Sequence, residues 1–309
     1  MGMDWALLKA VSRSFYLSMV WLPPAMRRGI ALGYMLARAT DSVADTSTAA
    51  PGKRAEILRQ MRRAVLGTLP PDERNGLLQE LRGEMAEAQT NPSESTLLRR
   101  FGECLEQLEQ VSEAELQLLR RVLSLIVKGQ LWDLTYFDDH EVVESAGETT
   151  RYTYLVAGCV GEFWTDLGLA TLGKEFCAPE RRDIMAQAAA RYGQGLQLIN
   201  ILRDIEEDAA RGRAYLALFR ERGETYPCKD SMEIWRNRAF RYLRDGLDYA
   251  RRLGSFRLRF TAMLPALLGW KTLRLIAQRT GNERVKITRW AVYATLVEAA
   301  LLSARRRVS

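Results

Sequence analysis

The chain has 309 residues, 47% of them hydrophobic and 27% charged, which is enough for a sizeable core in one large domain or two small ones of a soluble protein. Its 45 Lys and Arg residues exceed its 38 Asp and Glu residues and give a formal charge of +7, which suits nucleic acid, an anionic membrane surface or phosphorylated small substrates as partners. Four scattered cysteines without a CxxC pair, and a single histidine, argue against a zinc or disulfide framework and favour a reduced setting.

Helical periodicity runs along nearly the whole chain. Apolar residues recur at three- and four-residue spacing in the first segment, from Leu7 to Leu17, and again in segments 55–69, 75–88 and 113–134. The pattern predicts about ten helices, and no break is long or polar enough for a flexible linker. We therefore expect one all-α domain over residues 1–309. The expected breaks between helices fall at Pro23-Pro24, Pro51-Gly52, Pro70-Pro71, Asn91-Pro92, Gly147, Pro179 and Tyr226-Pro227.

The two ends of the chain give an expectation about location. The start, MGMDWALLKAVSRSF, lacks the basic, apolar and small-residue regions of a signal peptide. Near the end, WAVYATLVEAALLS is interrupted by Glu298 and is shorter than the roughly 20 apolar residues that a spanning helix needs. We expect a cytoplasmic protein that is soluble or peripheral at the inner membrane surface. The basic ending, Arg305–Arg307, is either a solvated tail or a source of attraction to that surface.

The stretch NILRDIEEDAARGRAYL, residues 200–216, carries an amide and two carboxylates at four-residue steps. Residues four apart lie one turn above another on a helix, so Asn200, Asp204 and Asp208 share one face and could hold a cation. Arg203 and Arg213 lie beside them in the sequence, and Arg213 has a second interpretation, in which it complements the negative end of the helix dipole.

A second acidic pair lies far upstream, in LARATDSVADT. Asp41 and Asp45 are again four apart, and Arg38 precedes them by three. One such pair means little, but both pairs follow apolar helical segments, where buried carboxylates are costly unless compensated. Magnesium supplies that compensation, because it bridges protein carboxylates to substrate phosphates. The pattern indicates a diphosphate clamp, and ionisation of an allylic diphosphate is the chemistry that such a clamp favours.

Four ordered motifs carry a resemblance to a known family. The chain resembles the squalene and phytoene synthase family, the all-α isoprenoid synthases that join two prenyl diphosphates at their head carbons. The resemblance covers nearly the whole chain, is closest to the bacterial squalene synthases, and implies a single-domain helical bundle around a central cleft. The motifs are VSRSFYLSMVWLPPAMR, YMLARATDSVADT, RYTYLVAGCVGEFW and LQLINILRDIEEDAARGRAYL.

The resemblance also implies roles for particular residues. Tyr152 matches the tyrosine that the family places near the reacting carbons, with a role in managing a proton or cation. Thr153 is a departure, because relatives often have Cys there. The resemblance implies that magnesium, with Mn²⁺ as the alternative ion, is bound by Asp41, Asp45, Asp204, Asp208 and Asn200. It implies that the diphosphate is contacted by Arg38, Arg203, Arg213 and Gln197. It also implies that Arg13 and Ser14 bind the diphosphate end near the first helix.

The resemblance favours a squalene synthase that condenses two farnesyl diphosphates and then reduces the product with NADPH. The segments SFRLRFTAMLPALLGWKTL and ERVKITRW resemble the squalene branch, and there Lys286 and Arg289 are candidates to bind the phosphates of NADPH. No Gly-x-Gly-x-x-Gly unit is present, so a Rossmann site is not expected.

Several alternatives stay open at this point. Among enzymes they are a dehydrosqualene or phytoene synthase and a presqualene-diphosphate synthase without the reductive step. A non-catalytic helical scaffold for anionic lipid or RNA would leave the four aspartates unexplained, and no RNA-recognition motif appears, so we expect no nucleic-acid partner. The stretch VAGCVG is also explained by close helix packing through Gly158 and Gly161. The oligomeric state is not predicted.

Overall fold

The structure is a computed structural model that describes residues 3–12, 15–217, 229–279 and 285–304. Over these residues the secondary structure is helical apart from one isolated β-bridge, between Val142 and Ala214. The prediction of an all-α fold is confirmed. The chain divides into two compact units, Met1–Thr135 and Tyr136–Ser309. The prediction of a single domain over residues 1–309 stays a prediction.

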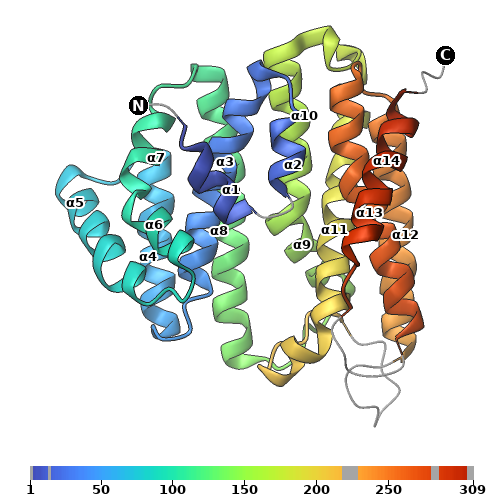
Figure 1. The fold of residues 1–309 in the computed structure, drawn as a ribbon. Helices are drawn as coiled ribbons and strands as arrows, with labels where there is room; N and C mark the ends of the chain where they lie inside the picture. Colours follow the sequence, from blue (N-terminus) through green and yellow to red (C-terminus); the bar gives the residue numbers. More distant parts are fainter. Residues whose placement is uncertain (1–2, 13–14, 218–228, 280–284, 305–309) are drawn as a thin grey trace. The chain divides into compact units, whose positions relative to one another are not determined.

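In the first unit, proline sets the starts of four helices. Pro24, Pro51, Pro71 and Pro92 each stand at the first helical position, where the missing N–H costs nothing. The helix α4 ends at Gly67, whose φ of 72° is left-handed. These starts agree with the breaks predicted from the sequence. The helices are α1 (Trp5–Ser12), α2 (Phe15–Val20), α3 (Pro24–Ala44), α4 (Pro51–Leu66), α5 (Pro71–Glu80), the π-helical turn η1 (Leu81–Met85), α6 (Pro92–Arg99), α7 (Phe101–Leu108) and α8 (Glu113–Asp139), shown in blue to green in Figure 1.

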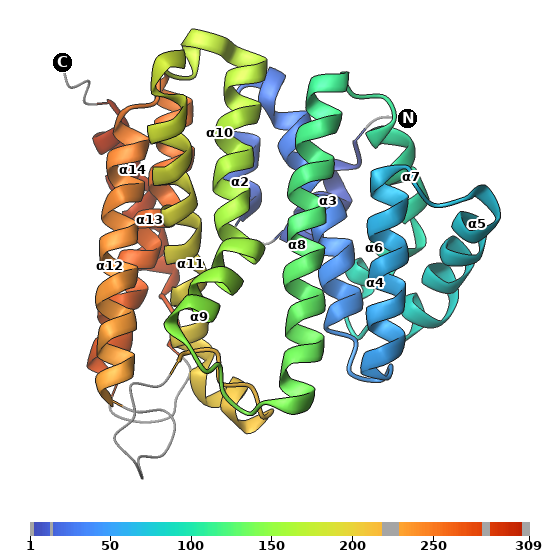
Figure 2. The same ribbon diagram turned by 180° about the vertical axis from the view of Figure 1, so that it is seen from behind.

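The second unit is built around the long helix α11 (Arg182–Ala210), which packs against α10, α12 and α13. Figure 2 shows α11 and α12 side by side, from the opposite direction to Figure 1. The other elements are α9 (Ala146–Thr153), the π-helical turn η2 (Tyr154–Gly158), α10 (Cys159–Leu172), the 3-10 turns η3 (Gly173–Glu175) and η4 (Pro179–Arg181), α12 (Lys229–Arg251), α13 (Phe256–Gln278) and α14 (Arg289–Ala304).

Small residues bring α10 and the π-helical turn η2 into close contact with α11. A Cβ at Gly161 would lie 2.0 Å from the carbonyl oxygen of Ala189, and a Cβ at Gly193 would lie 2.2 Å from that of Ala157. Neither distance leaves room for a side chain. The packing interpretation of VAGCVG is therefore confirmed at Gly161, where α10 lies directly against the backbone of α11.

One continuous helical run in the second unit, Ala146–Glu175, is long and apolar enough to cross a membrane by length and composition alone. Its most apolar window has a mean hydropathy of 1.2 and is 39% buried within the protein. The run includes α9, η2 and α10, which pack against α11. The core helices of soluble proteins pack in the same way. The length and apolar composition of this run are therefore only weak evidence for a membrane-spanning segment.

Candidate active site

The first acidic motif lies at the C-terminal end of α3. Asp41 is in the last turn of the helix, and Asp45 is the residue that ends it. The guanidinium of Arg38 donates a hydrogen bond to Asp41 through Nη1 and another to Glu94 Oε1 through Nη2, the latter at 2.6 Å. Asp45 is exposed and the Asp41 side chain keeps 42% of its surface accessible. Arg38 thus lies between two carboxylates, one of them predicted and one not.

Glu94 is the site residue that the sequence analysis missed. It stands in the first turn of α6, where it accepts hydrogen bonds from Asn91 Nδ2 at 2.9 Å and from the Ser42 hydroxyl at 3.3 Å, in addition to Arg38. Burial alone would raise its pKa, but these hydrogen bonds and the charge of Arg38 lower it. Glu94 is therefore a fixed negative charge that orients Arg38. The only local signal was the helix cap Asn91-Pro92, which predicts a helix start and no site.

The ionised carboxylate of Asp41 is destabilised by its surroundings. Desolvation and then the negative charge of Asp45 raise its pKa from 3.8 to about 7, and Glu94 adds to the rise, while Arg38 opposes it. A carboxylate that is crowded by like charges is stabilised by a cation placed between them. The motif as it stands thus favours either a proton or a metal ion at Asp41.

The second acidic motif lies along one side of α11. Gln197, Asn200, Asp204 and Asp208 follow one another at three- or four-residue steps within the helix, as predicted. Arg203 makes two parallel hydrogen bonds to Asp204, from Nε to Oδ1 at 2.9 Å and from Nη2 to Oδ2 at 2.6 Å. A hydrogen bond of 3.4 Å joins Asn200 Nδ2 to Gln197 Oε1. The second motif therefore repeats the combination seen at the first, a carboxylate pair with a guanidinium on one member.

The chain turns sharply after α11. The backbone N–H groups of Arg211 and Arg213 both donate to the Asp208 carbonyl, at 3.0 and 2.9 Å, and Gly212 between them has a φ of 74°. This turn keeps the half-buried Arg213 next to the acidic face. Arg211 instead pairs with the exposed Glu207 at 2.8 Å. Position thus favours Arg213 over Arg211 as a diphosphate contact.

Tyr152 lies in the last turn of α9, directly before the π-helical turn η2. It is 8% exposed, and its ring stacks on Tyr215 with 5.1 Å between the centroids. Thr149 fixes this pairing, because its hydroxyl donates to the Tyr215 carbonyl at 2.9 Å and accepts from the Ala217 N–H at 3.2 Å. Single π-helical turns are frequent at functional sites. The tyrosine is thereby tied to the segment that follows the second acidic motif.

The residues present fit a magnesium-bridged diphosphate. Among the described residues no three side chains of His, Cys, Asp or Glu are grouped as a ready-made metal site. Magnesium, however, usually takes one or two carboxylates and completes its shell with water and substrate oxygens. Arg38 Nε is buried and has no hydrogen-bond partner, so it is a donor suited to a phosphate oxygen. Within the first unit the holders would be Asp41 and Asp45 on α3, and within the second unit they would be Asp204 and Asp208, with Asn200, on α11.

Some predicted residues lie elsewhere. Arg13 and Ser14 are outside the described residues. Lys286 and Arg289 are exposed; Lys286 lies before α14 and Arg289 begins it. Upstream of them, Arg279 Nη1 donates to the Arg203 carbonyl at 3.4 Å, so the chain leaves α13 close to the second acidic motif.

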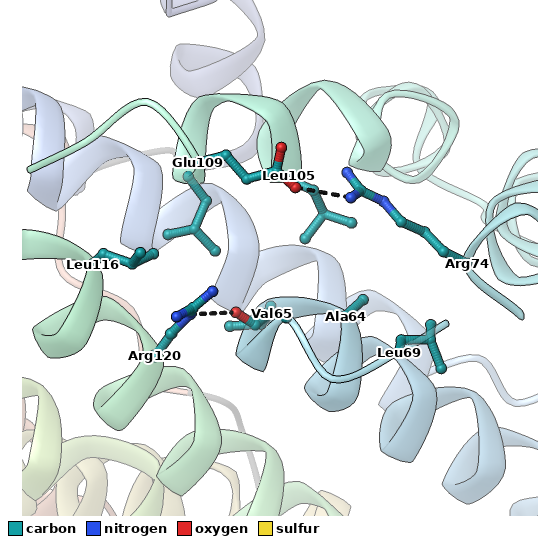
Figure 3. A pocket seen from close by; sticks show the side chains of 10 residues that line it. Ala64, Val65, Leu69, Arg74, Leu105, Glu109, Leu116 and Arg120 are labelled. Carbon is teal, nitrogen blue, oxygen red and sulfur yellow. Dashed lines mark hydrogen bonds and ion pairs between the residues drawn. The ribbon is translucent and has the colours of Figure 1, made fainter. Parts of the chain in front are cut away.

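A separate cavity in the first unit holds none of the predicted residues. It has a volume of about 140 Å³ and lies between α4, α7 and α8 (Figure 3), and it is smaller than the roughly 300–1,000 Å³ typical of ligand sites. Arg74 pairs with Glu109 at its rim at 2.8 Å, and Arg120 Nε donates to the Val65 carbonyl at 3.2 Å. These polar groups are engaged with the protein itself, so we do not assign the cavity to the active site.

Comparison with known proteins decides the family. The family model for squalene/phytoene synthase matches residues 8–291 and so includes both acidic motifs and the Tyr152 region. The chain belongs to the squalene/phytoene synthase family. The members of this family are prenyltransferases, and the family assignment made from the four motifs is confirmed.

Relatives within the squalene/phytoene synthase family include both branches. A squalene synthase of Eremothecium gossypii is 26% identical over 209 residues, which are 68% of this chain and 44% of the relative. A 15-cis-phytoene synthase of Synechocystis is 30% identical over 209 residues, 67% of this chain and 52% of the relative. The chain thus spans about half the length of these curated relatives. The solved structure of TcSQS with a ligand covers 97% of this chain and 87% of its own, with a TM-score of 0.73 at 19% identity, which shows a shared fold.

Proposed function

We propose that the protein is a squalene synthase, which condenses two farnesyl diphosphates head to head. In the first step one diphosphate and one proton leave, and presqualene diphosphate forms. In the second step the remaining diphosphate leaves, the carbon skeleton rearranges, and a hydride from NADPH completes squalene. The observation that carries the proposal is the repeated combination of a carboxylate pair and a bound guanidinium, on α3 and on α11, in a chain of this family.

The acidic residues and arginines have separate tasks in this proposal. Bound Mg²⁺, or Mn²⁺ as the alternative, supplies neutralisation of the departing diphosphate. Asp41, Asp45, Asp204 and Asp208, with Asn200, position the diphosphates through their oxygens. A second set of residues donates directly to phosphate oxygens, where charge develops as the carbon–oxygen bond breaks. That set comprises Arg38, Arg203, Arg213 and Gln197.

Tyr152 is our candidate for the residue that faces the reacting carbons. Its burial and its stacking on Tyr215 keep the ring in one orientation. A tyrosine can present the face of its ring to a carbocation and a hydroxyl to a proton. We propose that Tyr152 helps to remove the proton in the first step.

The reductive step rests on Lys286 and Arg289. Both are exposed cations, suited to the phosphates of a dinucleotide, and the bond from Arg279 to the Arg203 carbonyl brings the preceding chain near the second acidic motif. We propose that they bind NADPH. The phytoene and squalene relatives are similarly distant, so dehydrosqualene, phytoene and presqualene-diphosphate synthase remain the alternatives. We also propose a cytoplasmic location with peripheral contact at the inner membrane surface.

Product analysis tests the proposal. Purified protein with labelled farnesyl diphosphate and Mg²⁺ should accumulate presqualene diphosphate without NADPH and form squalene with it. Lys286→Ala should slow only the NADPH-dependent step, whereas Lys174→Ala, which also removes an exposed lysine, should change neither step. If NADPH changes neither rate nor product, the reductive assignment is wrong and the extracted product names the enzyme.

A further inference from the structure

A groove in the second unit is lined by basic side chains that the proposed reaction does not use. It lies between α9 and α12, which both pack against α11 (Figure 2). Its volume of about 610 Å³ is within the roughly 300–1,000 Å³ typical of ligand sites. We call it the arginine groove. The residues that line it are Thr150, Arg238, Arg241, Tyr242, Arg244 and Asp245.

The three arginines of the groove follow one another along α12. Arg238, Arg241 and Arg244 are three residues apart, so neighbouring guanidinium groups lie on adjacent turns of the helix and repel each other. Arg241 and Arg244 are exposed, and within the part of the chain that the structure describes their guanidinium groups form no hydrogen bond or ion pair. An anion bound between these groups would remove the repulsion and accept from their free donors.

The one acidic residue that lines the groove does not neutralise these charges. Asp245 lies one turn from Arg241, but its Oδ2 accepts a hydrogen bond from Arg191 Nε at 2.5 Å. Because Arg191 belongs to α11, this carboxylate is already paired with a neighbouring helix. Farther along α12 an arginine does have an acidic partner, since Arg251 pairs with Asp248 at 2.7 Å. The excess of positive charge is therefore a local property of the groove.

Arg238 is held in place at the α9 side of the groove. Its Nη1 donates to the Thr150 hydroxyl at 3.2 Å, and its guanidinium lies 4.5 Å from the centre of the Trp235 ring. The Thr150 hydroxyl in turn donates to the Ala146 carbonyl at 2.6 Å, which fixes the acceptor. A guanidinium held by neutral groups keeps its full charge for a ligand.

The lining and the length of the groove favour a soluble diphosphate over a membrane or a nucleic acid. None of the large hydrophobic side chains that are exposed on the described residues lines the groove, so it offers nothing to insert among acyl chains. The three arginines span about 9 Å along the helix, which is short for the run of phosphates that a nucleic acid presents. Guanidinium groups on adjacent turns suit two linked phosphates, because each phosphate can accept from a different arginine.

We propose that the arginine groove binds the diphosphate group of a soluble ligand, either free pyrophosphate or a diphosphate carried by an organic molecule. Arg241 and Arg244 supply free donors, and Arg238 supplies a positioned one. The groove shares no residue with the two acidic motifs, and it needs no metal ion because its own charge is positive. The proposal does not depend on which product the enzyme makes.

Calorimetric titration of the full chain with inorganic pyrophosphate tests this proposal. EDTA is present throughout, because the acidic motifs are expected to bind diphosphate through Mg²⁺. Arg241→Gln should weaken binding about tenfold, the loss expected for one charge-assisted hydrogen bond, and Arg244→Gln repeats the test. Arg257→Gln is the matched control and should bind as the wild type does, because Arg257 is also exposed and unpaired among the described residues but lies on α13. Thermal melting checks that each variant is folded.

A titration with ADP distinguishes the two sources of the diphosphate. ADP binding that Arg241→Gln weakens would identify an organic diphosphate as the ligand, and binding of pyrophosphate alone would identify the free anion. The proposal is overturned if the wild type binds neither probe, if both groove variants bind as the wild type does, or if Arg257→Gln loses as much binding as Arg241→Gln. Inorganic phosphate that binds as tightly as pyrophosphate would refute the preference for a diphosphate.

Discussion

The contact between Glu94 and Arg38 yields the sharpest prediction from the structure. Replacing Glu94 by Gln keeps the shape of the side chain and one oxygen that can accept from Arg38, but it removes the negative charge. Arg38 and Asn91 then donate to a neutral oxygen in place of a carboxylate oxygen, and the new NH2 group takes the place of Oε2, where it faces the Ser42 hydroxyl. If Glu94 orients Arg38 for a diphosphate, both stability and the pH dependence of the site should change.

The size of the stability change follows from burial. The Arg38 and Glu94 side chains are 24% and 13% exposed, so their pair is less screened than a surface pair. Hydrogen bonds to charged groups contribute about 1.5–3 kcal/mol and neutral ones about 0.5–1.5 kcal/mol. The bonds from Asn91 and Ser42 lose their charged acceptor, and this difference predicts that Glu94→Gln lowers the free energy of unfolding by about 1–2 kcal/mol. Urea denaturation measures this change.

Glu103→Gln is the matched control. Glu103 pairs with Arg100 at the same 2.6 Å, but the two side chains are 33% and 30% exposed, so its loss should cost less than about 1 kcal/mol. The functional readout is the pH profile of Mg²⁺-dependent turnover. Glu94 helps to raise the pKa of Asp41, so Glu94→Gln should move the rise in activity to lower pH, and Glu103→Gln should not. An unchanged pH profile with reduced stability would refute the role in the site and leave Glu94 as a packing residue.

Three further predictions concern Tyr152, Asp41 and Gly161. Tyr152→Phe should lose turnover while keeping substrate affinity, measured by turnover and direct binding; near-normal turnover would make Tyr152 a core residue. In metal-free protein the pKa of Asp41 is raised from 3.8 to about 7 in the folded state. The protonated carboxyl of Asp41 therefore stabilises the fold at low pH, and this stabilisation should be lost as pH rises through about 7. Denaturation curves at about pH 5 and pH 8 measure the loss, which Asp41→Asn should abolish. Gly161→Ala should destabilise the fold by about 1–3 kcal/mol or more, because its Cβ would lie 2.0 Å from the Ala189 carbonyl oxygen. Gly52→Ala is the control and should not destabilise the fold, because nothing lies within 4 Å of its Cβ. Equal melting temperatures of the two variants would contradict the packing interpretation.

The local parts of the fold could be predicted from the sequence, because their signals are local. Proline at the first helical position fixed the starts of α3 and α4, and four-residue spacing placed each acidic pair on one helix face. The π-helical turn after Tyr152 could not be predicted, since one extra residue in a helical turn leaves the apolar periodicity nearly unchanged.

Contacts between distant segments left no such signal. Glu94 is 56 residues from Arg38, and its own neighbourhood predicts only a helix cap. The division into two units was also hidden, because the boundary at Thr135 falls inside the continuous helix α8 and no Gly, Pro or polar linker marks it. Both features depend on how helices pack, which periodicity within one helix does not determine.

The most direct test of the central claim is calorimetric binding of an unreactive farnesyl diphosphate analogue. We predict that wild-type binding requires Mg²⁺ and is lost in EDTA. Asp45→Asn on α3 and Asp204→Asn on α11 should each weaken it by at least tenfold. Thermal melting checks that both variants are folded, and Asp204→Asn should lose some stability because Arg203 loses its charged partner. Full-strength binding in EDTA, or unaltered binding by both variants, would contradict magnesium-dependent diphosphate binding by the two acidic motifs.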